Sequence, residues 1–98
     1  MERTQPYTQP THMSEEFIDW ITEQVFNLDN RTTMLRNLAV ADRAIIIDYI
    51  SSELIGWADK YLIQKRMQIS FTSTLNAAEE LVNIWETKFK KEIARMKS

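Results

Sequence analysis

The sequence predicts an all-α protein, and three observations support this fold class. The 98 residues contain one glycine and two prolines, too few for the turns of a β protein of this size. The alternation of polar and apolar residues that marks a half-buried strand is absent. Apolar residues instead recur every three or four positions, as in amphipathic helices. We therefore expect a small helical bundle built on a long antiparallel helical hairpin, with one or two shorter helices before it.

The first residues of the chain are expected to lie outside this bundle. Residues 1–13 are polar and contain both prolines, so they bury too little surface to fold and are predicted to form a flexible tail. A docking motif around Tyr7 is the alternative interpretation. His12 and Met13 also match a cloning junction, in which case part of this tail is vector-derived. Residues 14–98 are predicted to form a single domain.

Two short helices are predicted at the start of the domain. Ser14 is a suitable N-cap for the first helix. Its core face is expected to contain Phe17, Ile21, Val25 and Leu28. Phe26 projects from the opposite side, so either this helix ends early or Phe26 is exposed and marks an interface. A second helix is predicted from about Thr33 to Val40, with inward-facing residues Met34, Leu35 and Leu38. The sequence leaves open whether this second helix continues into the next one.

The segment from Asp42 to Ile69 predicts one long helix with apolar residues on two faces. Asp42 is its expected N-cap. The face that we expect to meet the core contains Ile46, Ile47, Ile50, Leu54, Trp57 and Tyr61. The nearly opposite face contains Ile45, Tyr49, Ser52, Gly56, Ile63 and Met67. A helix that is apolar nearly all round is either central in its domain or covered by a partner, so this segment carries more apolar surface than one small core needs.

Gly56 lies in the middle of this predicted helix, where glycine costs about 1 kcal/mol relative to alanine. It follows Ser52 by four residues on the second face, so two small side chains would let another backbone approach closely. One interpretation is a helix crossing at an oligomer or partner interface. The other is packing within the same chain, or a kink.

A final helix is predicted from Leu75 to Lys97, after a hydroxyl-rich turn at residues 70–74. Thr74 or Asn76 is expected to cap it. Its core stripe is expected to contain Leu75, Ala78, Val82, Trp85, Phe89, Ile93 and Met96. An antiparallel arrangement of this helix against the Asp42–Ile69 helix would form the hairpin of the bundle.

The composition argues against catalysis and against cofactor or metal binding. The chain has no cysteine, and its single histidine, His12, falls in the predicted tail, so no thiolate or paired-histidine metal site and no nucleophile–histidine pair can be assembled in the domain. The carboxylate pairs Glu15/Asp19 and Asp19/Glu23 could hold a cation or a basic partner, but a solvated helix face is the favoured interpretation. One glycine is too few for a phosphate-binding loop. We therefore expect no enzyme activity and no cofactor. Without a leader sequence or an apolar run of about 18 residues, a cytoplasmic protein without a membrane span is expected.

The surplus of apolar surface favours a protein-interaction module that acts as an adaptor, regulator or inhibitor. We expect it to form a homodimer and to bind a protein partner, with an interface drawn from Phe26, Ile45, Tyr49, Ser52, Gly56, Ile63 and Met67. The alternative is a dimeric, helix-turn-helix-like DNA-binding regulator. Contacts to an anionic partner are expected from Lys88, Lys91 and Arg95. The net charge of −2 makes nucleic acid the less favoured partner.

Overall fold

A computed structural model describes residues 13–97, and within this range the chain is all-helical. It contains five helices, α1 (Glu15–Val25), α2 (Arg31–Val40), α3 (Arg43–Lys65), α4 (Thr74–Lys88) and α5 (Lys90–Lys97). The predicted fold class is therefore confirmed. Most of the predicted tail, including Tyr7 and His12, lies outside the described residues. Met13 is described, and its side chain is partly buried against the core.

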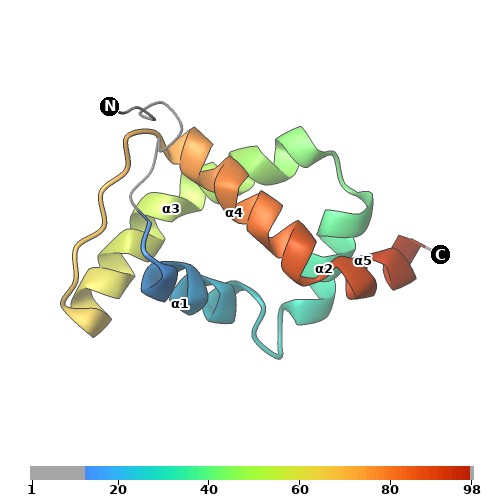
Figure 1. Cartoon of the computed structure of the whole chain (residues 1–98), viewed down its shortest axis with the longest axis horizontal. Coiled ribbons are helices and arrows are strands. Elements are labelled where there is room, and N and C mark those ends of the chain that lie inside the picture. The colour runs from blue at the N-terminus through green and yellow to red at the C-terminus, as the bar shows by residue number, and fades with distance from the viewer. Residues whose placement is uncertain (1–12, 98) are drawn as a thin grey trace, which may run out of the picture.

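The longest helix, α3, forms one side of the molecule, and α4 crosses it at a steep angle (Figure 1). The chain then continues into α5, which packs against α2. The molecule measures 45 × 33 × 20 Å. Because a helix with its side chains is about 10–12 Å across, the shortest dimension accommodates two layers of helices. Each helix can therefore be covered by the other layer on one of its faces, while the opposite face points out of the molecule.

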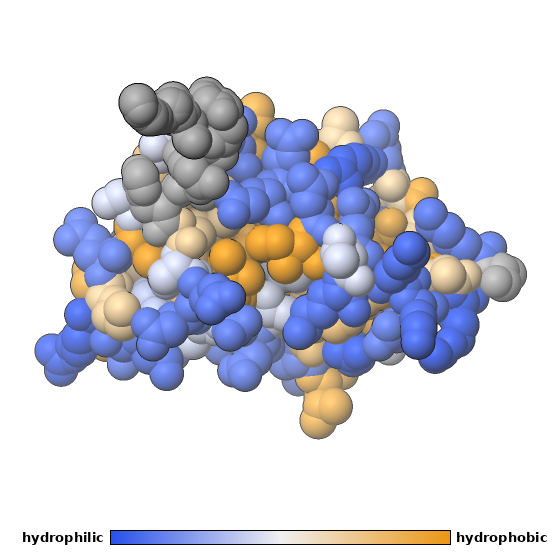
Figure 2. Space-filling model, in the orientation of Figure 1, coloured by the Kyte–Doolittle hydropathy of each residue, from blue (hydrophilic) through white to orange (hydrophobic). Residues whose placement is uncertain are grey.

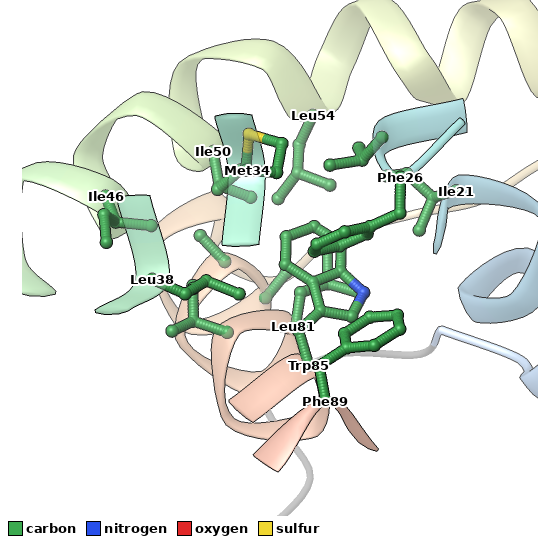
Figure 3. Packing of buried hydrophobic residues seen from close by; sticks show 14 of the residues in the cluster. Ile21, Phe26, Met34, Leu38, Ile46, Ile50, Leu54, Leu81, Trp85 and Phe89 are labelled. Atoms are coloured by element: carbon green, nitrogen blue, oxygen red, sulfur yellow. The ribbon is translucent and has the colours of Figure 1, made fainter. Parts of the chain in front are cut away.

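Trp85 lies at the centre of the core (Figure 3). Its indole Nε1–H donates a hydrogen bond of 2.8 Å to the hydroxyl of Thr22, which itself donates to the carbonyl oxygen of Ile18 at 2.7 Å. The ring of Phe26 meets Trp85 edge-on, with 5.2 Å between the ring centroids, and lies 4.5 Å from the ring of Phe89. These contacts tie α1 to α4. From α3, the core receives Ile46, Ile50, Leu54, Ala58 and Tyr61.

A second aromatic group joins α1 to the C-terminal half of α3. The ring centroid of Tyr61 lies 5.1 Å from that of Phe17 and 5.2 Å from that of Trp20. The indole Nε1–H of Trp20 donates to the side-chain oxygen of Gln64 at 3.2 Å. The segment between α3 and α4 adds Phe71, whose ring centroid lies 6.2 Å from that of Phe17. The two aromatic groups together hold α1 across the core side of α3.

Two of the predicted helix caps are confirmed and one is wrong. The Ser14 hydroxyl accepts from the backbone N–H of Phe17, and the Asp42 carboxylate accepts from that of Ala44. α4 is capped by Ser73 instead of Thr74 or Asn76. The backbone of Ser73 is extended, and its hydroxyl accepts from the N–H of Asn76 at 3.1 Å. Helices α2 and α3 are separate, because Ala41 and Asp42 both have extended backbones.

The first helix ends early, which is the first of the two alternatives that the sequence allowed. The side-chain oxygen of Asn27 accepts from the backbone N–H groups of Asp29 and Asn30, at 3.0 and 3.1 Å. This Asx turn stops the helix, so Phe26 packs into the core and Leu28 is 96% exposed. The predictions of an exposed Phe26 and a core-facing Leu28 are therefore wrong. Inward-facing Met34, Leu35 and Leu38 are confirmed for α2.

The long central helix ends at Lys65, four residues before the predicted Ile69. Arg66 adopts the left-handed conformation, with φ 59°, which terminates the helix. The chain then runs back to α4, and the side chains of Ile69 and Phe71 pack against the core. Met67 therefore follows α3 instead of lying on it. Its sulfur accepts from the Tyr61 hydroxyl at 3.6 Å.

The long antiparallel hairpin is not confirmed, since α4 crosses α3 steeply and the last helix is divided at Phe89. Phe89 is buried at this division, and the guanidinium of Arg31 lies 5.0 Å from its ring centroid. Arg31 also pairs with Glu92 at 3.1 Å. The change of direction thus brings α5 onto α2. The predicted core stripe is otherwise largely confirmed, but Leu75 is 54% exposed.

We expect Thr22→Val to lower the free energy of unfolding by about 1–3 kcal/mol, because valine keeps the volume but leaves the Trp85 N–H buried without an acceptor. Thr22→Ser retains the hydroxyl and serves as the matched control. Urea unfolding followed by circular dichroism measures both variants. A Thr22→Val variant as stable as the unmodified chain would show that the hydrogen bond makes no net contribution.

Candidate protein interface

The side of α3 that points away from the core is largely apolar, and none of the other helices described in residues 13–97 covers it. Ile63 is 75% exposed, Ile45 65% and Tyr49 52%, values far above those of their buried neighbours on the same helix. The backbone between them carries Ser52 and Gly56, which are also exposed. We call these five residues the outer face. Most of the predicted interface residues are thus brought together on one surface.

The outer face results from the periodicity of α3 and from the two-layer fold. Residues 45, 49, 52, 56 and 63 project opposite the side that contacts α4. In Figure 1, α4 lies in front of α3, so the outer face points away from the viewer. The face that is visible in Figure 2 is largely hydrophilic, with a small apolar area at its centre.

The outer face has two flanks of different character. On one flank, Ile55 and Leu62 are exposed, 56% and 42%, and extend the apolar surface. On the other flank lie the exposed charges Glu53 and Lys60. Met67 is 42% exposed and lies just beyond the end of the helix, so it borders this surface instead of forming part of the helical stripe.

No described residue gives Gly56 a steric role. A Cβ atom added to it would meet no atom of residues 13–97 within 4 Å, apart from the helix's own backbone and the glycine's chain neighbours. Helix α3 continues without interruption from Arg43 to Lys65. Within residues 13–97, neither internal packing nor a break in the helix accounts for Gly56, and these made up the second interpretation drawn from the sequence.

A groove lies next to the outer face, between α2, α3 and the end of α1, with a volume of about 540 Å³. Buried side chains of Val25, Met34 and Ile46 form its base. Ile45, Tyr49 and Trp57 add apolar area. The rest of the lining is mostly polar and includes the side chains of Gln24, Asn30, Thr33, Asn37 and Glu53. Sequence reasoning missed this groove because three separate helices contribute to it, although Ile45 and Tyr49 were among the predicted interface residues.

Phe26 is not available to a partner. It is 7% exposed and lies between Trp85 and Phe89. Leu28, which was expected in the core, is the exposed apolar residue of this region instead. The signal that could have distinguished the two was the sequence around Asn27, Asp29 and Asn30, which favours an Asx turn immediately after the helix.

The three basic residues predicted to contact an anionic partner are all exposed. Lys88 ends α4, whereas Lys91 and Arg95 belong to α5. The neighbouring Glu92 is paired with Arg31, so its charge is partly compensated within the chain. Figure 2 shows strongly hydrophilic surface at the α5 end of the molecule. These basic residues belong to α4 and α5, whereas the outer face belongs to α3.

Within residues 13–97, no group of three or more His, Cys, Asp or Glu side chains is placed to hold a metal ion. None of the helices in this range is both long and apolar enough to cross a membrane.

No protein-family model matches the chain, and comparisons with curated proteins and with solved structures also find no match. Function must therefore be inferred from the surfaces of the molecule, because function depends on sites and not on the fold class.

We expect Gly56→Ala to raise the free energy of unfolding of the isolated chain by about 1 kcal/mol, because alanine is the better helix former and the added methyl group meets no neighbour. Ser52→Ala on the same face is the control, with a smaller increase expected. Unfolding should be followed at concentrations where the chain is monomeric. A destabilised Gly56→Ala monomer would reveal a contact within the chain.

Proposed function

We propose that the protein is a small, non-enzymatic interaction module that self-associates through the outer face of α3 and binds a protein partner as an adaptor, regulator or inhibitor. The observation that carries this proposal is the exposure of Ile45, Tyr49 and Ile63 on one side of a helix. Contiguous exposed apolar surface of this kind marks interaction sites on soluble proteins.

The size of the apolar gain sets the expected affinity. Full burial of an isoleucine side chain contributes roughly 1.5–3 kcal/mol. A dimer would bury Ile45 and Ile63 of both copies, so the gain is comparable to the roughly 4–15 kcal/mol that association itself costs. Tyr49 adds a large amphipathic side chain with few rotamers to order. We therefore expect weak self-association that depends strongly on the protein concentration.

The groove beside the outer face supports the binding of a further protein. Its apolar base and its polar margin resemble the composition of protein interfaces, where a desolvated centre is surrounded by hydrogen-bonding groups. The amides of Gln24, Asn30 and Asn37 could pair with the backbone of a bound segment. Ile45 and Tyr49 belong to both surfaces, so partner binding and self-association would influence each other.

Sedimentation equilibrium across about 1–100 µM tests self-association. We expect a dimer that dissociates on dilution, and we expect Gly56→Leu and Ile63→Glu to weaken it while helicity is retained. Leu28→Glu is the matched control, because Leu28 is exposed but lies in the turn between α1 and α2. A chain that remains monomeric throughout this range would contradict the proposal.

The DNA-binding alternative has weaker support. Helices α2 and α3 follow each other closely, as in a helix-turn-helix, and Arg43 is the basic residue at the start of α3. Its guanidinium, however, donates to the side chains of Glu86 and Asn83, so it is engaged within the chain. Residues Ala44 and Ile45, which follow it, offer no hydrogen-bonding side chain to base edges.

We expect no gel shift of mixed-sequence DNA at about 50 mM salt, where electrostatic binding to phosphates is strong. A shift that weakens as the salt concentration rises would favour the DNA-binding alternative. Lys91→Glu with Arg95→Glu would then show whether the basic surface of α5 makes the phosphate contacts.

A further inference from the structure

We infer that two copies of the chain pair their α3 helices in an antiparallel orientation, with the two-fold axis passing beside Gly56. This inference rests on the self-association proposed above and specifies its geometry. It is drawn from the spacing of the outer face and from the charges on its flanks.

The outer face has the spacing of a coiled-coil seam. Steps of four and three residues alternate along α3 through Ile45, Tyr49, Ser52 and Gly56. The same spacing reaches Ile63 by way of the exposed Asp59, a charged position within the stripe that does not belong to the outer face. Residues spaced in this way form a narrow stripe that can contact a second helix along its length. The flanking positions then decide the orientation, because they are the ones that face each other across a helix pair.

A parallel pair would bring like charges together. In that orientation, a residue on the flank of Ile55 and Leu62 lies next to a residue of the second copy whose number is higher by five and which belongs to the flank of Glu53 and Lys60. Asp48 would then lie next to Glu53 of the second copy, and this repulsion would occur twice by symmetry. Both carboxylates are exposed and would have to approach each other at the interface.

An antiparallel pair brings opposite charges together. In that orientation each flank faces the same flank of the second copy. Glu53 and Lys60 share a flank, so Glu53 can pair with Lys60 of the second copy, and the symmetry repeats the pair. The outer face is thus complementary to itself in this orientation, which identifies a second copy as its occupant.

This charge pairing also fixes the register. It places the two-fold axis halfway between positions 53 and 60, which is next to Gly56. The missing side chain then lies where the two helices approach most closely, in space that the described part of the chain leaves open. Tyr49 lies seven and a half residues before this axis and Ile63 six and a half after it, so Tyr49 of one copy lies at about the level of Ile63 and Gln64 of the other.

Charge reversal on the flank tests this arrangement. Glu53→Lys places two lysines opposite each other in the antiparallel dimer, so we expect its dissociation constant to rise about 10-fold, and similarly for Lys60→Glu. An equimolar mixture of the two variants restores opposite charges at both positions and should regain the unmodified affinity. Glu79→Lys on α4 is the control for net charge. Circular dichroism confirms folding of each variant.

The outcomes separate the geometry from the proposed function. A Glu53→Lys dimer that is tighter than the unmodified one would indicate the parallel pair, in which the introduced lysine meets Asp48 of the second copy. That result would overturn the antiparallel arrangement while the dimer stands. Unchanged affinity, or no recovery on mixing, would overturn it as well. A chain that is monomeric at about 100 µM would overturn both the geometry and the self-association.

Discussion

The hydrogen bond between Trp85 and Thr22 is the interaction on which the rest of the fold depends. An indole N–H can be buried at low cost only when it has an acceptor, and Thr22 is the buried polar side chain of the described residues that provides one. Satisfying this group fixes α1 against α4. Phe26 and Phe89 complete the packing around the same ring. The core is thereby assembled on one side of α3 alone.

The one-sided core explains why a strongly apolar helix retains an uncovered face. With only two layers of helices, α3 can bury Ile50, Leu54 and Tyr61 but has no further helix to place over Ile45 and Ile63. Surface-to-volume scaling makes this outcome common for short chains, which run out of elements before all apolar surface is covered. The proposed association would remove that surface from water.

Sequence periodicity predicted the interior of the helices well and their ends poorly. The inward residues of α3 and its outer face follow from angular spacing alone, so both could be assigned without a structure. Phe26 and Leu28 exchanged roles because a side-chain hydrogen bond of Asn27 ended the helix. The left-handed Arg66 and the division at Phe89 depend on packing between distant segments, which single-sequence patterns do not encode. The groove could not be predicted from the sequence either, because residues of three separate helices line it.

Gly56 gives the clearest indication of how the outer face is used. In a monomer, glycine at this position lowers helix stability by about 1 kcal/mol and gains no contact in return. Ile45 and Ile63 likewise leave most of their apolar surface in contact with water in a single chain. Sequences that fold well are usually consistent from local preference to global packing, so three exceptions on one face require a common cause. The proposed helix crossing would supply it, because the glycine would permit the approach that buries the isoleucines.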